Sequence, residues 1–375
     1  MLSWVHFGDL HVTSDDGYES VKQLDRLVAV VNANVAPAVD FAYLPGDNAN
    51  NGTSEQYARI RSALAALSLT VNAIPGDHDF EPGSLETFYR ELNASALPKR
   101  VDTNGHRCLF LDVVSEGIGG PNFKLGDAQT SWVDEQLGAA TQDQERPVVF
   151  MHAYPGDLAE GGEALARLFA SRGVAVVDTG HTHYNELLND GSVIYAATRS
   201  TGQIEEDEGR AGMAIATVDG SVVSWRFQRV DGDWPLVMIT TPADRRLVTQ
   251  PSDERQVPRS QCTVRAKVFG GQVGEVIATI GEHRTAMQPV PGERRVWQAE
   301  LRVPSDVDSY HVKVTASDAK GNSGSDSVEA LTPKGADKRS LSNATPGTDA
   351  HAIGDWAAHG LLGSQLGPNK NGRDW

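Results

Sequence analysis

Cysteine and long apolar runs are scarce in this chain. Of its 375 residues only two are cysteines, Cys108 and Cys262, which fall in separate predicted domains and form no metal-spaced pair. No uninterrupted apolar run approaches the ~20 residues that a helix needs to span a bilayer. A strand-like run begins almost at Met1 with no charged segment before it, so we expect no signal peptide and a cytoplasmic location.

Basic residues are also fewer than acidic residues. The chain has 33 Lys and Arg against 50 Asp and Glu, which gives a formal net charge of −17. Proteins that hold nucleic acid on their surface need a basic patch, and none is visible here. We therefore expect neither nucleic acid nor a membrane as a partner. The acidic run Glu205–Glu208 is interpreted as an exposed loop without a ligand role.

The first 200 residues alternate strand-like runs with amphipathic helical patterns. One apolar stripe follows the first strand-like run, a second follows Ser54, a plausible N-cap, and a third precedes residue 174. This alternation predicts βαβ units and a mostly parallel sheet. Short β runs between residues 192 and 229 predict a second sheet, so the fold class is α/β with one domain over residues 1–230.

The pattern changes after residue 230. Residues 231–258 are rich in Pro, Asp and Arg and are predicted to be a linker with one strand, Leu236–Thr240. Residues 259–332 contain strand-like runs at regular short spacing without helical patterns, which predicts a small all-β sandwich resembling immunoglobulin or fibronectin modules. Residues 333–375 are predicted to be extended and then docked on this chain or on a neighbour, which would allow a homo-oligomer. The apolar residues behind that prediction are Ile353, Trp356, Leu361, Leu362, Leu366 and Trp375.

Five short blocks of acidic and histidine residues each follow a strand-like run. Ligands bind outside the carboxyl ends of the strands in an open α/β sheet, so the blocks should share one crevice. Carboxylates with imidazoles, and no thiolate, suit Mn, Fe or Zn. The runs are Leu2–Phe7, Phe41–Leu44, Leu69–Ile74, Val148–Met151 and Val174–Val177; the blocks are Asp9-Leu10-His11, Gly46-Asp47-Asn48, Gly76-Asp77-His78-Asp79, His152 and Gly180-His181-Thr182-His183.

The order of these blocks resembles the calcineurin-like, or binuclear, metallophosphoesterases. That family reads D-x-H, G-D, G-N-H-[DE], H and G-H-x-H in the same order, and the resemblance covers residues 1–230. No single block is specific, but five in order, each after a strand, indicate the family. The resemblance implies a two-sheet αββα sandwich and metal-dependent hydrolysis of a phosphoester.

The resemblance also implies a role for each site residue. Two divalent or mixed-valence metal ions would be bound, and a hydroxide bridging them would attack phosphorus. His78 stays free of metal and would donate a proton or hydrogen bond to the phosphate or leaving group. Asp79 either orients His78 or is simply a helix N-terminal residue. One metal would take Asp9, His11, Asp47 and His183, and the other Asp47, Asp77, His152 and His181.

Asp77 departs from the family pattern, which has a neutral Asn at this position. Two divalent ions, three carboxylates and one hydroxide sum to zero, whereas an Asn would leave +1. A neutral cluster attracts a phosphate dianion less strongly, and a trivalent ion would restore the charge. The alternative is that Asp serves as an oxygen ligand with little consequence.

Substrate contacts and substrate identity are less constrained by the sequence. Asn48 could touch substrate or form a plain turn, and Arg199 could clamp a phosphate or lie on the surface. A phosphodiester is expected, either a cyclic nucleotide or a small glycerophosphodiester; the alternative is a phosphomonoesterase with the same metals. An alternative of another class is a non-catalytic metal-binding scaffold whose β-sandwich docks a partner.

Overall fold

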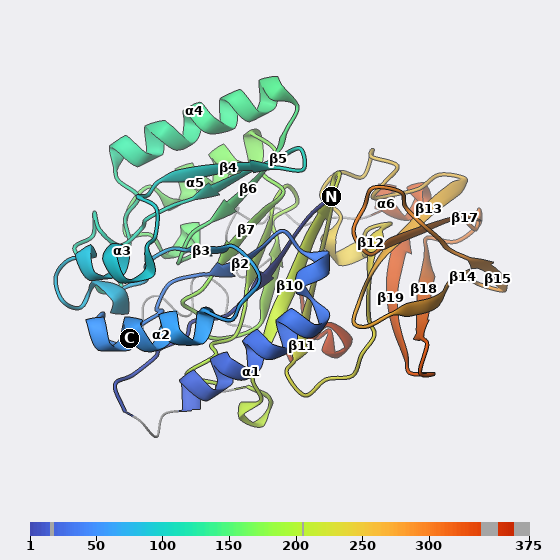
Figure 1. The fold of residues 1–375 in the computed structure, drawn as a ribbon. Coiled ribbons are helices and arrows are strands. Elements are labelled where there is room, and N and C mark those ends of the chain that lie inside the picture. Colours follow the sequence, from blue (N-terminus) through green and yellow to red (C-terminus); the bar gives the residue numbers. More distant parts are fainter. Residues whose placement is uncertain (16–18, 205, 339–351, 364–375) are drawn as a thin grey trace.

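The computed structural model describes residues 1–15, 19–204, 206–338 and 352–363 (Figure 1). Its N-terminal domain contains two β-sheets. The five-stranded sheet has the order β11 (Val222–Arg229), β10 (Gly212–Asp219), β1 (Leu2–His6), β2 (Phe41–Leu44) and β3 (Val71–Ala73). The six-stranded sheet has the order β4 (Lys99–Thr103), β5 (His106–Phe110), β6 (Arg146–Phe150), β7 (Val176–Thr179), β9 (Ile194–Ala197) and β8 (Glu186–Asn189). β1, β2 and β3 are parallel, as are β5, β6, β7 and β9.

Helices cover the outer faces of the two sheets, which confirms the expected αββα sandwich (Figure 1). Apolar residues of α1 and α2 pack on the five-stranded sheet, and those of α4 and α5 pack on the six-stranded sheet. Between the sheets, the rings of Trp4, Phe41 and Tyr43 meet those of Phe110 and Phe150. The helices are α1 (Glu19–Asn34), α2 (Ser54–Leu64), α3 (Glu86–Leu92), α4 (Asp127–Asp143) and α5 (Gly162–Ser171).

The start of α2 shows how local sequence determines the residue at which a helix begins. Thr53 is the N-cap: its hydroxyl accepts the Gln56 amide, and the Gln56 side chain accepts the Thr53 amide, which forms a capping box. Ser54 is therefore the first residue of the helix, and the N-cap expected there lies one residue earlier. Tyr57, Ile60 and Ala63 then form the buried face of the helix.

The C-terminal strands form two four-stranded sheets of a β-sandwich. β12 (Leu236–Thr241), β13 (Gln261–Phe269), β17 (Val296–Arg302) and β16 (Gln288–Pro289) make one sheet, and β15 (His283–Ala286), β14 (Val273–Ile280), β18 (Ser309–Asp318) and β19 (Ser323–Leu331) make the other. β12 lies in the segment expected to be a linker, yet it pairs with β13 along its length. We therefore propose that the sandwich begins at β12.

The sandwich and the N-terminal domain share a core and a polar contact. Leu236, Met238 and Phe269 of the sandwich lie in the same apolar cluster as residues of α1 and β1. Nearby, the Lys267 ammonium is buried and donates to the Ser3 hydroxyl at 2.8 Å. The two units are therefore joined by a packed interface.

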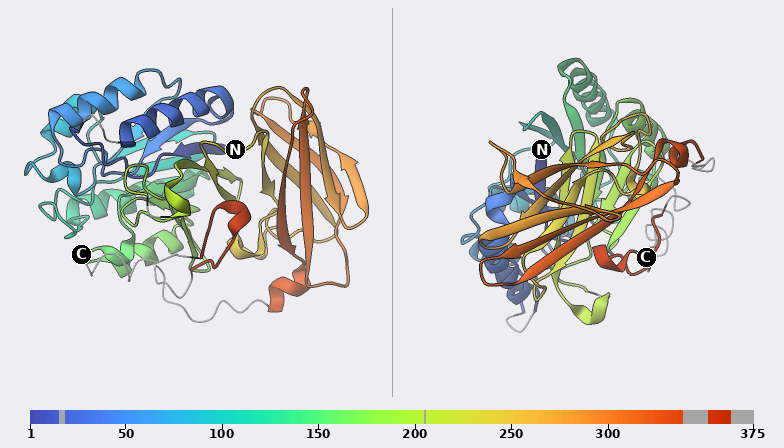
Figure 2. Two further views of the ribbon diagram at one scale, coloured as in Figure 1. Left: turned by 90° about the horizontal axis from the view of Figure 1, so that it is seen from below. Right: turned by 90° about the vertical axis from the view of Figure 1, so that its right-hand side faces the viewer.

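The described part of the C-terminal segment lies between these two units (Figure 2). Ile353, Trp356 and Leu361 are buried in the cluster between the sheets, whereas Leu362 is exposed. Leu366 and Trp375 lie outside the described residues. The segment follows α6 (Pro333–Lys338) in the chain and contains the short helix η7 (Ala357–His359).

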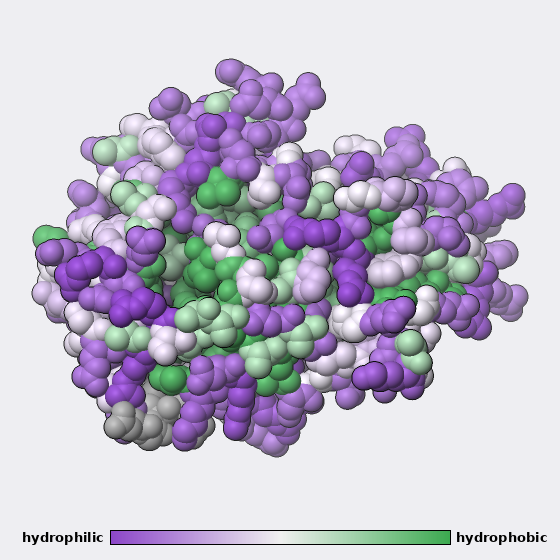
Figure 3. Space-filling view, in the orientation of Figure 1, coloured by the Kyte–Doolittle hydropathy of each residue, from purple (hydrophilic) through white to green (hydrophobic). Residues whose placement is uncertain are grey.

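Hydrophilic residues cover most of the face seen in Figure 3, including α4 at the top and the outer end of the sandwich at the right. Hydrophobic residues show mainly in the middle of the N-terminal domain. Among the residues that the structure describes, none of the helices has the length and apolar character needed to cross a bilayer.

Candidate metal centre

The five blocks converge because each lies just beyond the carboxyl end of a strand. Asp9, Asp47 and Asp77 follow β1, β2 and β3 of one sheet, while His152 and His181 follow β6 and β7 of the other. The site therefore lies where the two sheets face each other. Glycines permit the close approach: a Cβ on Gly76 would lie 2.1 Å from Asp47 Oδ1, and one on Gly180 would lie 2.4 Å from Asp9 Oδ1.

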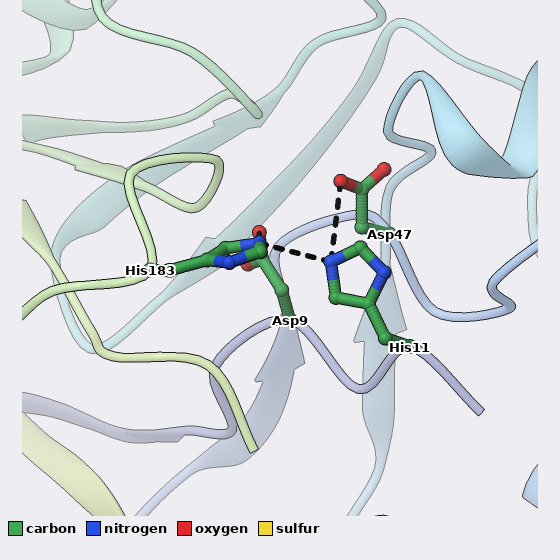
Figure 4. Close-up of side chains that lie close together, drawn as sticks. All are labelled: Asp9, His11, Asp47 and His183. Atoms are coloured by element: carbon green, nitrogen blue, oxygen red, sulfur yellow. Dashed lines mark hydrogen bonds and ion pairs between the residues drawn. The ribbon is translucent and has the colours of Figure 1, made fainter. Parts of the chain in front are cut away.

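One group consists of Asp9, His11, Asp47 and His183, whose side chains point toward one another (Figure 4). His11 Nε2 lies 2.9 Å from His183 Nε2 and 3.6 Å from Asp47 Oδ2. His183 Nε2 also lies 3.6 Å from Asp9 Oδ2. This is the set that the resemblance implies for the first metal ion.

A second group consists of Asp77, His152 and His181. His152 Nε2 lies 3.3 Å from Asp77 Oδ1 and 3.6 Å from Asp47 Oδ2, and His181 Nδ1 lies 3.9 Å from Asp77 Oδ1. Asp47 thus stands between the two groups, as the resemblance implies for a bridging carboxylate.

The backbone holds several of these residues in a strained conformation. His11, Asp47, His181 and His183 all have positive φ, at 42°, 50°, 67° and 62°. Residues other than glycine rarely occupy this region, and they remain there only when surrounding contacts fix them. Such contacts are present: the His11 amide donates to the Asp47 carbonyl, and the His181 amide donates to Asp9 Oδ2.

The chemistry of the donor set fits metal ions. His152 Nδ1 lies 2.8 Å from the Pro45 carbonyl and donates to it, so Nε2 is the ring nitrogen that faces the Asp47 and Asp77 carboxylates and would be the one to hold a metal ion. Among the described residues, Asp9 Oδ1, Asp77 Oδ1 and His152 Nε2 are buried without a hydrogen-bond partner. Burial also raises the pKa of Asp9 to about 7 and lowers that of His11 to about 3. A cation bound between these groups would give the buried oxygen and nitrogen atoms a partner. It would also favour the charged form of Asp9 and the neutral form of His11.

His78 lies beside the first group. Its ring meets that of His11 edge-to-face with centroids 4.7 Å apart, and its amide donates to Asp47 Oδ1 at 3.0 Å. His78 Nδ1 lies 2.9 Å from the Asn50 carbonyl, and about a third of the side chain is exposed, 34%. Burial opposes the charge on the ring, but the Asp47 carboxylate and the Asn50 carbonyl raise its pKa above the ordinary value. His78 thus lies beside the first group with a partly exposed ring whose pKa is raised.

Among the described residues no hydrogen bond joins the Asp79 carboxylate to the His78 ring, and Asp79 lies in the first turn of the short helix η2 (His78–Phe80), which is the alternative considered from sequence. Its carboxylate is buried and accepts hydrogen bonds from the amides of Asn48, Ala49 and Gly76 and from the Tyr57 hydroxyl. Asn48 is fully buried, and its amide group donates to Asp79 and to the Ile74 carbonyl. These two residues fix the loops after β2 and β3 to each other, so Asn48 has a structural role in these loops, and a substrate contact of its side chain stays a prediction.

Arg199 is not a surface residue, and its guanidinium is bound within the protein. Its side chain is 2% exposed and lies over the Phe227 ring, while the guanidinium contacts Asp207 and the Arg210 carbonyl. The acidic run is likewise more than an exposed loop, because Glu206 is buried and its carboxylate accepts the Asn185 amide at 3.1 Å.

Phe123 is a site residue that the sequence did not reveal. Its buried ring packs against the rings of His181 and His152, with centroids 4.8 and 5.6 Å away. It comes from the loop between β5 and α4, which contains no ligand motif. An isolated aromatic residue before a helix gives no signal of such a position.

Comparison with known families agrees with this geometry. The model of the calcineurin-like phosphoesterase family matches residues 3–185. This part of the chain is a calcineurin-like phosphoesterase domain. The match contains all five strands that precede the metal-site blocks and ends just after the loop with His181 and His183.

The chain is also similar to individual phosphoesterases. The chain is 27% identical over 161 residues to a probable cyclic nucleotide phosphodiesterase of Moraxella catarrhalis, and 28% identical over 160 residues to the glycerophosphodiester phosphodiesterase GpdQ of Enterobacter lignolyticus. Each match covers 40% of this chain and 56% of the relative, so the chain spans about half the length of these curated relatives. The fold is similar to that of a dimetal phosphatase from Danio rerio, with a TM-score of 0.51, 15% identity and coverage of 62% of this chain and 98% of that one.

Proposed function

We propose that this protein hydrolyses a phosphodiester with the help of two metal ions. The observation that carries the proposal is the pair of ligand groups with Asp47 between them: Asp47 Oδ2 lies 3.6 Å from both His11 Nε2 and His152 Nε2. A carboxylate in that position can bridge two cations about 3.5–4 Å apart. Mn, Fe or Zn suits the mixed carboxylate and imidazole donors.

When bound, the metals would supply a water nucleophile of lowered pKa and neutralise charge on the phosphate. The protein's own contribution is positional. Asp9 Oδ2 and Asp47 Oδ1 accept backbone amides, so their orientation is fixed before any ligand arrives. The partly exposed His78, whose pKa is raised, is placed to donate a proton or hydrogen bond to a non-bridging or leaving oxygen.

A diester is favoured over a monoester because of charge. Asp77 adds a third carboxylate to the two groups, where its family pattern has a neutral side chain. A diester carries one negative charge and a monoester nearly two at neutral pH, so the extra carboxylate disfavours the monoester more. The relatives named as phosphodiesterases support the same choice, with a cyclic nucleotide or a small glycerophosphodiester as substrate.

A metal-loaded activity panel tests the proposal. Bis-(4-nitrophenyl) phosphate, 4-nitrophenyl phosphate, a cyclic nucleotide and a glycerophosphodiester are compared at equal metal occupancy. We expect the highest kcat/KM with a diester, and its loss in Asp47→Asn but not in the control Asp318→Asn, a partly exposed position at the end of β18 in the sandwich. A higher value for the monoester would identify a phosphomonoesterase. No hydrolysis with two metals bound would indicate the non-catalytic scaffold.

A further inference from the structure

Residues 352–363 extend the edge of the six-stranded sheet. The Ile353 amide donates to the Leu187 carbonyl at 2.8 Å, and Ala352 forms an antiparallel bridge with Leu188. β8, which contains Leu187, is the last strand of its sheet. Figure 2 shows this segment between the N-terminal domain and the sandwich. It is therefore part of the folded core, although Ala352 and its partner Leu188 in β8 are 164 positions apart in the chain.

The segment then closes on itself and contacts both domains. Trp356 and Leu361 exchange two backbone hydrogen bonds, and the Trp356 ring stacks on His359 with centroids 3.8 Å apart. The buried His359 ring lies 2.9 Å from the carbonyl of Trp225 in β11 and 2.9 Å from the carboxylate of Asp326 in β19. One imidazole thus connects the sandwich to the five-stranded sheet.

Gly360, the residue after His359, contacts the chain just after the loop that contains His181 and His183. The Gly360 carbonyl accepts a hydrogen bond of 3.0 Å from the side-chain amide of Asn185, two residues after His183. Asn185 is fully buried, and its side-chain oxygen accepts the Arg199 amide at 3.0 Å. Because His181 and His183 both have positive φ, their loop depends on outside contacts of this kind.

We propose that residues 352–363 form a strap that positions His181 and His183 through the contact between Gly360 and Asn185. Asn185 is then a positioning residue, and His359 is the anchor that holds the strap against the sandwich. The inference rests on the proposed function, because it assigns these two imidazoles to the metal centre. It gives the sandwich a role in that centre without any contact to substrate.

Hydrogen exchange in the metal-free protein tests the strap independently of metal binding and hydrolysis. His359→Ala in the full chain should speed exchange of the backbone amides 181–185 by roughly tenfold, the factor expected for loss of about one buried hydrogen bond. His311→Ala, which removes an exposed imidazole of the sandwich, should leave these amides unchanged. Faster exchange at Leu187 and in the sandwich, with amides 181–185 unaltered, would overturn the proposal.

Metal affinity supplies a second measurement. Calorimetric titration with Mn²⁺ should give a Kd roughly tenfold higher for His359→Ala than for the parent. Asn185→Asp removes the donor to Gly360 and keeps the acceptor for Arg199, but it also adds charge near the metals. Comparing Asn185→Asp in the parent and in His359→Ala cancels the charge effect, because that effect is common to both backgrounds.

The two substitutions should be coupled, so that Asn185→Asp changes the Kd by a different factor in each background. Equal factors would mean that the strap does not act through Asn185, and the proposal would fail even if two metals bind and phosphoesters are hydrolysed. If instead the parent binds neither Mn²⁺, Fe²⁺ nor Zn²⁺, the proposed function fails, and the exchange experiment alone still decides whether the strap supports the loop.

Discussion

His11 Nε2 and His183 Nε2 lie 2.9 Å apart in the interior of the protein. Two imidazole lone pairs at that distance repel each other unless a proton or a cation lies beside both. Nitrogen ligands of one tetrahedral zinc, each about 2.0–2.1 Å from the ion, lie about 3.3 Å from each other. Two side chains that are 172 residues apart in the chain are thus nearly at the spacing that a shared metal ion requires.

We predict two metal ions per chain. The two ligand groups offer eight coordinating positions if Asp47 serves both. Elemental analysis of protein purified without chelator should give about two equivalents of Mn, Fe or Zn. Chelation should lower the Tm, because ions that bind only the folded state stabilise it. A value of one or less after reconstitution would contradict the prediction.

We predict that His78→Ala lowers kcat without loss of metal. The ring lies beside His11 of the first group, is partly exposed and belongs to neither ligand group. Removal of a general acid–base group typically costs about 10²–10⁴ in rate. His283→Ala, at an exposed position of β15, is the control. Loss of a metal equivalent in His78→Ala would show that His78 is a ligand.

The buried Lys267 should make stability rise with pH in a defined window. Burial lowers its pKa from 10.5 to about 8 in the folded protein. Between pH 8 and 10.5 the unfolded chain therefore holds a proton that the folded chain has released, so the free energy of unfolding increases with pH. Below pH 8 both states are protonated and this contribution is constant. Its full size is about 3 kcal/mol.

Denaturant titrations at a series of pH values measure this effect. Lys267→Met should lose the rise, whereas Lys313→Met, at an exposed position of β18, should retain it. The comparison between the two variants cancels the titration of tyrosines and other lysines, which is common to both. Equal pH dependence in the two variants would mean that Lys267 keeps its proton through contacts other than Ser3.

The carboxyl ends of the five strands before the site were predictable to within two residues, because local composition largely determines them. Apolar runs such as Phe41–Leu44 are buried strands, and the acid that follows each run lies at the carboxyl edge of a sheet. α4 left little signal, because only Val133, Leu137 and Ala140 form its buried face. A short apolar stripe of this kind is easily lost among polar residues.

The non-local contacts of the site could not be predicted. Asp79 was expected either to orient the adjacent His78 or to be a helix N-terminal residue, and the sequence did not indicate that its carboxylate accepts a hydrogen bond from the Tyr57 hydroxyl, 2.7 Å away. Arg199 was expected at substrate or at the surface, but its partner Asp207 holds it in the interior. Spacing along one strand indicates which side chains share an edge, whereas their hydrogen-bond partners depend on how separate loops meet.

The strongest test of substrate preference is Asp77→Asn. Asp77 Oδ1 lies 3.3 Å from His152 Nε2, so its charge is close to the second ligand group. Replacing it with Asn makes the site one unit more positive while keeping an oxygen ligand. The added attraction should be larger for a monoester dianion than for a diester monoanion.

We therefore expect Asp77→Asn to raise kcat/KM for 4-nitrophenyl phosphate relative to bis-(4-nitrophenyl) phosphate, at equal metal occupancy. The change should be modest, roughly three- to tenfold, because effective dielectrics near a solvent-accessible site are high. Asp112→Asn is the matched control, since that carboxylate caps the loop at Val114 and Ser115. It should leave the ratio unaltered. An unchanged or opposite shift in Asp77→Asn would mean that the carboxylate acts only as an oxygen ligand, and the preference for diesters would then have to come from the shape of the site.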